Sequence, residues 1–348
     1  MDLSNLIRKV PKAELHIHIE GSMEPSLLFT LASRNSIALP YTLESCQDQR
    51  KNYQNLEEFL NLYYDACQVL IHEQDFFDLA QSYLQKAISG SVTHCEIFFD
   101  PQTHLNRGIQ FGTIITGFHR ASEEVKNLIH VQWILCFLRD LTQDAAFEVI
   151  KLAEPYKEWI HGVGLDSAEV GNPPEKFKDA YKVAADAGLC GKDCLFKVAH
   201  AREIDDSSDV VATLYYLGVS RIDHGVQAIE STGLCKFLKD SQIPLTCCPL
   251  SYKMLKIEEL FFGERKVIKE LFDRGVVVTI NSDDPAFFGG YICENFDYVL
   301  YDFEESRRKE VLRTLCKNSF LASFISQEMK EENYRKIDEV MASYSILT

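Results

Sequence analysis

The strongest constraint on the fold is a series of eight short, β-rich segments that alternate with helical patterns. The segments span 13–19, 92–99, 129–137, 160–165, 195–199, 219–222, 243–246 and 276–280. They are apolar almost throughout, as expected of parallel strands that are covered by helices. Eight such β/α units predict an α/β fold, a parallel (β/α)8 TIM barrel. A doubly wound open sheet is the alternative, but no GxGxxG or Walker motif follows any of the strands.

Two further helical regions lie outside this alternation. Between 25 and 90 the apolar spacing predicts three helices, inserted after the first strand, with a polar loop around 44–55. Between 303 and 346 it predicts two or three charged amphipathic helices that complete the outer layer. No linker or low-complexity tract interrupts the 348 residues. We therefore expect residues 1–348 to form a single barrel domain.

Charge and composition exclude several classes of function. The 36 Lys and Arg residues against 52 Asp and Glu residues leave a net charge of −16, which disfavours binding to nucleic acid or to an anionic membrane. No apolar run approaches the ~20 residues of a membrane span. The first residues lack the pattern of a signal peptide. The 11 cysteines contain no CxxC pair, as expected of reduced thiols in a cytoplasmic protein.

In a barrel of this kind, functional groups gather at the carboxyl ends of the strands. Four of the ten histidines occur at such positions, namely His16, His18, His200 and His224. His16 and His18 are two residues apart, so both side chains point to the same face of their strand. Two adjacent acids, Asp283 and Asp284, follow the eighth strand. A random scatter would rarely place so many of these residues at one rim.

Three imidazoles and a carboxylate form a ligand set that suits Zn²⁺. We predict that His16, His18, His200 and Asp283 bind the metal and that water completes the site. A second metal would need a bridging group, often a modified lysine at a strand end. The fourth strand has no lysine, and Lys197 points away from the face of His200. One Zn²⁺ per chain is therefore expected.

The remaining polar residues at this rim suit hydrolysis, because a metal lowers the pKa of bound water toward about 7. His224 is placed to act as a base, although it could be a fifth ligand or a structural histidine. Glu203 is placed to act as an acid or base, or as a carboxylate at a helix start. Asp284 would point toward the substrate, or cap a turn. A purely structural role is plausible for any one of these three residues, but not for all three at the same rim.

The segments HIHIEG, HARE, DHG and SDDP, in this order and spacing, resemble the adenosine/adenine deaminase family of metal-dependent barrel hydrolases. The resemblance extends over essentially the whole chain. It implies that zinc activates water for attack on C6 of a purine and that ammonia leaves. It also implies that Glu203 protonates N1, that His224 orients and assists the water, and that Asp284 forms a hydrogen bond with N7. His16, His18, His200 and Asp283 match the zinc ligands.

Within the family, the segments around 164–174 and 282–291 are similar to the branch that acts on the free base adenine. The nucleoside-acting branch tends to have an aspartate at the position of Glu20 and a glycine near Glu169. Bulkier acids at both positions fit a pocket that is closed where ribose would lie. The resemblance thus implies hydrolysis of adenine to hypoxanthine in purine salvage. Arg202 and Tyr252 depart from the family pattern of glycine and asparagine, which leaves adenosine or an N6-substituted adenine as alternative substrates.

Three other classes of function have less support from the sequence. A cytidine-type zinc deaminase needs a PCxxC segment, and no proline here precedes a cysteine. A phosphoesterase would need basic groups or a second metal at the rim, and only Arg202 is basic there. A non-catalytic purine-binding barrel would be favoured by loss of a ligand or of the acid, but all seven positions are filled. We therefore expect a small purine as partner, and the sequence gives no oligomeric state.

Overall fold

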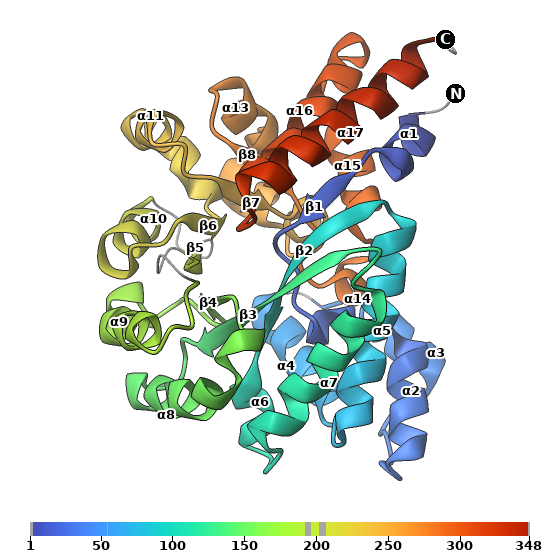
Figure 1. Ribbon diagram of the computed structural model, residues 1–348, viewed down its shortest axis with the longest axis vertical. Helices are drawn as coiled ribbons and strands as arrows, with labels where there is room; N and C mark the ends of the chain where they lie inside the picture. The colour runs from blue at the N-terminus through green and yellow to red at the C-terminus, as the bar shows by residue number, and fades with distance from the viewer. Residues whose placement is uncertain (1–2, 54, 192–195, 202–206, 347–348) are drawn as a thin grey trace.

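A computed structural model describes residues 3–53, 55–191, 196–201 and 207–346. Its strands pair in parallel, in the orders β1-β2-β3-β4 and β5-β6-β7-β8 (Figure 1). Their bounds are β1 (Lys12–Glu14), β2 (Val92–Phe99), β3 (His130–Leu138), β4 (Gly162–Asp166), β5 (Val198–Ala201), β6 (Arg221–His224), β7 (Leu245–Cys247) and β8 (Val278–Ile280).

The two four-stranded sheets join at both edges. An isolated bridge between Val163 and Lys197 connects β4 to β5. At the other edge, the His18 N–H donates to the Asp283 carbonyl (3.1 Å), and the Asp283 N–H donates to the His16 carbonyl (3.0 Å). The predicted TIM barrel is therefore confirmed. The regular part of the first strand is shorter than predicted, since β1 ends at Glu14 and the chain continues as single bridges through Ile17 and His18.

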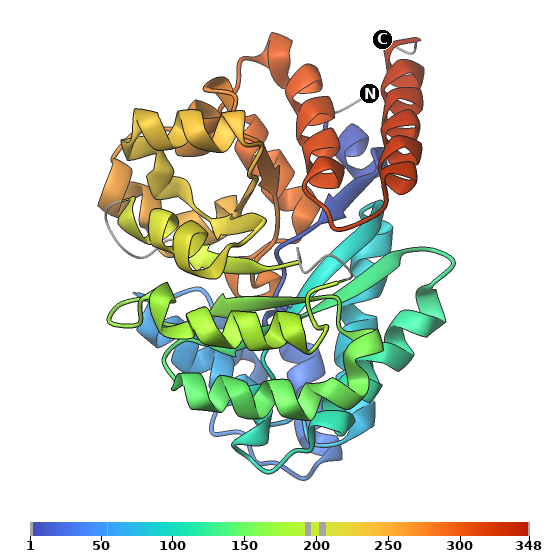
Figure 2. The ribbon, with the colours of Figure 1, turned by 60° about the vertical axis from the view of Figure 1, so that its left-hand side comes forward.

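Helices surround the barrel and cover its outer face (Figures 1 and 2). The region between β1 and β2 holds α2 (Pro25–Arg34), α3 (Leu43–Gln49), α4 (Leu56–Cys67) and α5 (Glu73–Ser89). The sequence predicted three helices here, and that number is wrong. The missed helix is α3, which has only one buried side chain, Cys46, and so leaves almost no apolar periodicity. Its start is set by the Thr42 side chain, which accepts a hydrogen bond from the Ser45 N–H.

The remaining helices follow the strands in order. They are α6 (Pro101–Leu105), α7 (Phe111–Val125), α8 (Gln143–Ala153), α9 (Lys178–Asp186), α10 (Ser208–Ala212), α11 (Thr232–Asp240), α12 (Pro249–Met254), α13 (Val267–Asp273), α14 (Pro285–Phe288), α15 (Ile292–Leu300), α16 (Arg308–Leu321) and α17 (Gln327–Ile346). The short helix α1 (Leu3–Lys9) precedes the barrel. The long helices α16 and α17 confirm the charged helices predicted at the end of the chain.

The barrel interior is layered along its axis. Glu96 and Arg221 form a buried ion pair inside the barrel. Next along β2 comes a small apolar cluster of Phe98, Ile134, Cys136 and Val198. The carboxyl ends of the strands follow this cluster, so a layer of apolar side chains lies directly beneath the polar rim.

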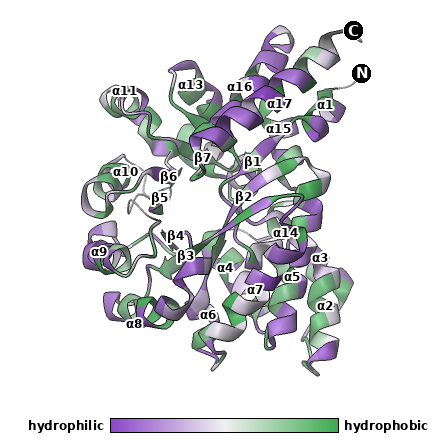
Figure 3. Cartoon of the chain, in the orientation of Figure 1, coloured by the Kyte–Doolittle hydropathy of each residue, from purple (hydrophilic) through white to green (hydrophobic). Residues whose placement is uncertain are grey.

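Hydropathy is distributed as expected for a barrel with an outer layer of amphipathic helices. Outer helices such as α16 and α17 carry hydrophilic and hydrophobic residues along their length (Figure 3). In α16 the buried side chains form adjacent pairs that recur every four residues, so one stripe of the helix faces the core; they are Val311, Leu312, Leu315, Cys316, Ser319 and Phe320. Among the described residues, no helix is long and apolar enough to cross a membrane.

Candidate active site

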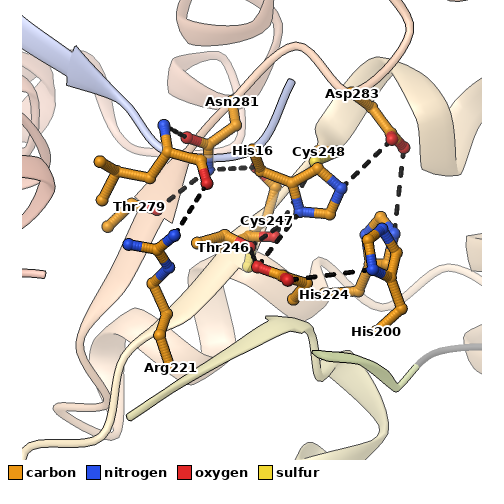
Figure 4. A network of polar contacts seen from close by, with 12 residues as sticks. His16, His200, Arg221, His224, Thr246, Cys247, Cys248, Thr279, Asn281 and Asp283 are labelled. Carbon is orange, nitrogen blue, oxygen red and sulfur yellow. Dashed lines mark hydrogen bonds and ion pairs between the residues drawn. The ribbon is translucent and has the colours of Figure 1, made fainter. Parts of the chain in front are cut away.

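The four predicted metal ligands meet at the carboxyl end of the barrel. Nitrogen and oxygen atoms of His16, His18, His200 and Asp283 all lie within 4.8 Å of one another, and all four residues are buried. Asp283 Oδ1 lies 3.2 Å from His16 Nε2 and 3.6 Å from His18 Nε2. Figure 4 shows His16, His200 and Asp283 turned toward one another. Residues more than 260 positions apart in the sequence therefore form one cluster.

Hydrogen bonds behind His16 determine which ring nitrogen is free to bind a metal. The Thr246 hydroxyl donates its proton to Asp223 Oδ1 (2.8 Å), so it can only accept the contact with His16 Nδ1 (2.8 Å). His16 is therefore protonated on Nδ1, and Nε2 presents a lone pair. This Nε2 is buried and has no hydrogen-bond partner among the described residues. A lone pair left in this way fits a metal ligand.

His200 is oriented by the same principle. Its Nδ1 lies 3.0 Å from the Leu165 carbonyl, which can only accept, so the Nδ1–H donates. The Nε2 lone pair is then directed at His18 Nε2, 3.1 Å away. His18 Nδ1 in turn lies 3.5 Å from Asp166 Oδ2. Three imidazole nitrogens and a carboxylate oxygen crowded together in this way fit a divalent cation, and this donor set suits Zn²⁺.

Asp223 supports the cluster, although the sequence did not single it out. Its carboxylate accepts from Thr246 and lies 3.7 Å from His16 Nδ1 and 3.8 Å from His200 Nδ1. Burial raises its pKa, while His16 and Arg221 oppose the increase. A carboxylate behind ligand imidazoles raises their basicity and fixes their tautomers. Asp223 could have been identified from the sequence by its position immediately before His224 in the DHG segment.

His224 adjoins the cluster from the end of β6. Its Nε2 lies 4.0 Å from Asp283 Oδ2, and its Nδ1 lies 3.2 Å from the Tyr252 hydroxyl. The backbone of His224 is left-handed (φ 63°), an uncommon conformation for this residue that turns the ring toward the site. His224 also belongs to a second group of clustered donors, with His16, Cys248 and Asp283. This geometry suits a base beside the metal cluster, and it is equally compatible with His224 as a fifth metal ligand.

Asp283 and Asp284 both line the cavity, although adjacent strand residues usually face opposite ways. Asp283 has a left-handed backbone (φ 63°), which reverses the alternation at this point. Asp284 then begins α14 and packs against Gly21. A Cβ atom on Gly21 would lie 1.9 Å from Asp284 Oδ1. The glycine of the HIHIEG segment is therefore required for the position of Asp284.

A cavity opens above the cluster. Helix α4 contributes its apolar side, with Leu56, Phe59 and Leu60. The polar lining comes from strand ends and from the loop after β4, with His18, Asp100, Asp166, Ser167, Glu169, His200, His224, Asp283 and Asp284. Glu169 is thus where the sequence expected it, on the cavity wall, and it lies 3.7 Å from the buried Arg139.

Glu20 is buried but is not among the described residues that line this cavity. Its Oε1 accepts from His104 Nε2 (3.0 Å) and from the Asp100 N–H (3.3 Å). Burial raises the pKa of Glu20 to about 7. The side chain that reaches the cavity beside it is Asp100, whose pKa is also raised to about 7 by burial and by the Glu20 carboxylate. Sequence reasoning missed Asp100, although it directly follows β2, because an aspartate before a proline is also a common helix start.

Glu203 and Arg202 lie outside the described residues. The predicted acid–base role of Glu203 and the expected effect of the neighbouring cation therefore stay predictions. His200 and Ala201, which precede them, are described and end β5 at the cavity.

Comparisons with known proteins identify the family and the fold of this chain. The family model for adenosine deaminase matches residues 11–340. An adenine deaminase from Psychrobacter cryohalolentis is 46% identical over 344 residues, which cover 97% of this chain and 99% of that protein. The crystal structure of adenine deaminase from Arthrobacter aurescens has a TM-score of 0.88 and 39% identity, covering 95% of this chain and 98% of that one. An amidohydrolase from Burkholderia ambifaria, solved with bound Zn, shares the fold (TM-score 0.85, 22% identity, 99% and 96% covered).

Proposed function

This chain belongs to the adenosine deaminase family, and on that premise we propose that it is an adenine deaminase, a hydrolase that converts adenine and water to hypoxanthine and ammonia. Nearly full-length similarity to adenine deaminases from several bacteria supports the substrate. The observation that supports hydrolysis most directly is the convergence of three imidazoles and one carboxylate at the base of one cavity. We extend the proposal to one catalytic domain over residues 1–348 and to a role in cytoplasmic purine salvage.

We assign one Zn²⁺ to His16, His18, His200 and Asp283. When bound, such an ion acts as a Lewis acid that makes water a stronger nucleophile near neutral pH. The tautomers of His16 and His200, which leave Nε2 unprotonated, support this assignment. Purified protein should contain about one zinc per chain, and His200→Ala should lose most of it. Two tightly held metals, or full activity without metal, would contradict the assignment.

The proton transfers are assigned to two residues. His224 takes a proton from the attacking water, and its Nδ1 contact with the Tyr252 hydroxyl holds the ring in place. Glu203 donates a proton to N1 of the purine, which makes C6 more electrophilic. Glu203→Gln should keep zinc and lose activity by about 10²-fold or more. His224→Ala should also keep zinc, and zinc loss in this variant would make His224 a ligand instead.

Substrate recognition is assigned to three acids, one of which acts indirectly. Asp284 forms the hydrogen bond with N7, which requires either a protonated Asp284 or a purine tautomer with hydrogen on N7. Glu169 closes the cavity at the loop after β4, and Glu20 supports the wall beside it. Asp284→Ala should keep zinc and lower kcat/KM for adenine. If 7-deazaadenine performs as well as a matched control, the N7 contact is wrong.

A substrate comparison tests the proposed function directly. Adenine, adenosine, AMP and N6-methyladenine would each be offered to zinc-loaded protein, with release of ammonia or methylamine as the measurement. We expect kcat/KM for adenine to exceed that for adenosine by a large factor. Comparable turnover of adenine and adenosine would overturn adenine specificity and leave purine deamination standing. Turnover of none of the four would overturn the proposed function.

A further inference from the structure

The cavity wall next to the metal cluster contains a buried acid with no assigned role, Asp100, which has an oxygen within 4.8 Å of a His18 ring nitrogen and of an Asp166 oxygen. Asp100 directly follows β2, is 3% exposed and lines the cavity. Its Oδ2 accepts a hydrogen bond from the Tyr63 hydroxyl (3.2 Å). Its Oδ1 is buried without a hydrogen-bond donor within the part of the chain that the structure describes. A buried carboxylate oxygen without a donor is costly unless a ligand supplies one.

Neighbouring polar groups on this side are engaged elsewhere. Glu169 lies 3.7 Å from Arg139, and Ser167 shares a hydrogen bond with the Tyr64 hydroxyl (3.0 Å). Asp166 directs Oδ2 at His18 Nδ1. Asp166 also shares a side-chain hydrogen bond with Asp100, and burial together with the Asp100 charge raises the pKa of Asp166 well above its usual range, so one proton can lie between the two carboxyl groups. Three oxygens, Asp100 Oδ1 and both of Asp166, have no donor from any other described residue, and one shared proton satisfies two of them at most. A further donor is left for the substrate to supply.

A buried relay holds Asp100 in this position. Arg107 donates to His104 Nδ1 (2.8 Å), so the proton of the neutral imidazole is on Nε2. This Nε2–H donates to Glu20 Oε1 (3.0 Å), which also accepts the Asp100 N–H (3.3 Å). Glu20 thereby fixes the backbone of Asp100 while Tyr63 fixes its side chain. A carboxylate held at both points is preorganised to accept a hydrogen bond in a defined direction.

The chemistry of purines identifies the donor. On the proposed function, C6 faces the metal cluster and N7 faces Asp284. With C6 at the metal cluster and N7 at Asp284, we place the N3–N9 edge, which lies across the ring system from C6, at the cavity wall that Asp100 and Asp166 line. In one tautomer of free adenine, N9 bears a hydrogen, whereas in adenosine N9 bears ribose.

We propose that Asp100 is the residue that selects the free base, accepting a hydrogen bond from N9–H through Oδ1, with Glu20, His104 and Tyr63 as positioning residues. The inference rests on the proposed function and moves the selection of the free base from Glu20 and Glu169 to Asp100. A site with a buried polar group made for one N–H rejects an analogue that lacks it by about 10⁴-fold, far more than an apolar mismatch does. A carboxylate here also repels a sugar oxygen more strongly than an apolar wall would.

The test compares adenine with 9-methyladenine, which lacks N9–H and adds only a methyl group. We expect zinc-loaded wild-type protein to favour adenine in kcat/KM by about 10³-fold or more. Asp100→Leu keeps the branched shape of the side chain and removes the acceptor, so this ratio should fall at least about 10²-fold, mainly because adenine becomes a poorer substrate. The matched control is Asp65→Leu, which changes an exposed aspartate on α4 and should leave the ratio unchanged.

The ratio compares two substrates on one protein, so partial unfolding cancels. Tyr63→Phe provides a second variant in case Asp100→Leu is too unstable to assay; it removes the hydroxyl that orients Asp100, and the ratio should fall about tenfold. Zinc content should stay at the wild-type level in both variants. A ratio that stays at its wild-type value in either variant, with adenine still turned over, overturns the inference alone. Absence of adenine turnover by the wild type overturns the proposed function, and the inference with it.

Discussion

Strand β2 and the residue directly after it carry two buried carboxyl groups, Glu96 and Asp100, four residues apart, and their environments are opposite. Glu96 accepts hydrogen bonds from Arg221 (2.6 Å), His94 (3.0 Å) and the Phe324 N–H (2.5 Å). Burial alone would raise its pKa, but Arg221 and these donors lower the pKa to about 2. Asp100, beyond the apolar layer of Phe98, faces the acids Glu20 and Asp166, and its pKa rises to about 7.

The difference separates a structural acid from a functional one. Both side chains are fully buried, so burial does not distinguish them. What distinguishes them is whether the protein supplies a cation and enough donors. Glu96 is satisfied by the fold and stabilises it, whereas Asp100 is left for a ligand and is held at a cost in stability. The four predictions below test this contrast.

The largest expected effect is at the structural acid. Glu96→Gln keeps the shape of the side chain but leaves Arg221 as an uncompensated buried charge. Breaking a buried pair in this way costs about 3–5 kcal/mol. Urea unfolding should show this decrease in the free energy of unfolding. Glu123→Gln, which breaks an exposed pair with Lys126, is the control and should change nothing measurable. Equal stability of the two variants would show that the Glu96–Arg221 pair contributes little.

The pH dependence of stability should reveal the same acid. The pKa of Glu96 is lowered from 4.5 to about 2 on folding, so its stabilising contribution is present above pH 4.5 and is lost as the pH falls toward 2. At 1.36 kcal/mol per pKa unit, this contribution is about 3 kcal/mol. The difference in unfolding free energy between wild type and Glu96→Gln should therefore fall with decreasing pH in this window. A difference that is constant from pH 5 to pH 3 would contradict the lowered pKa.

At the carboxyl ends of the strands, where the candidate site lies, a substitution that adds one methyl group should affect catalysis. Gly21→Ala places a Cβ atom against the carboxylate of Asp284, which has to move. Displacing a substrate-binding group by about 1 Å costs about 10²-fold in rate, and we expect this loss in kcat/KM with zinc content unchanged. Gly233→Ala is the control, because a Cβ atom there meets no atom closer than 3.9 Å. Wild-type kinetics in Gly21→Ala would mean that Asp284 does not contact the substrate.

The smallest expected effect is an increase in the free energy of unfolding, opposite in sign to the decrease expected for Glu96→Gln. Because the pKa of Asp100 is raised from 3.8 to about 7, the ionised form destabilises the folded protein above pH 7, and the penalty lessens as the pH falls. Asp100→Asn removes this charge and should increase the free energy of unfolding at pH 8 by about 0.5–2 kcal/mol. The increase should shrink toward pH 5. A loss of stability at pH 8 would place Asp100 with Glu96 as a structural acid.

Much of this architecture follows from local sequence pattern. The apolar strand segments and the spacing between them predict the barrel, because strand and helix periods are local properties of the chain. Helix α3 was missed for the same reason, since a short polar helix with one buried residue has no such period. The clustering of the four candidate metal ligands could also be predicted from the sequence, because parallel strands in a barrel bring their carboxyl ends to one rim.

Local sequence pattern alone predicts the barrel, its rim and the residue types that meet there, with His16, His18, His200 and Asp283 as the expected ligand set. The folded chain adds the long-range contacts that orient these groups. The tautomer of His16 depends on Thr246 and Asp223, more than 200 residues away, and the orientation of Asp283 depends on one left-handed backbone angle. Whether Glu20 or Asp100 reaches the cavity depends on a contact with His104, 84 residues from Glu20. Such long-range packing and hydrogen bonding leave no local periodicity, which is why a pattern in the chain locates the site but does not assign the role of each acid within it.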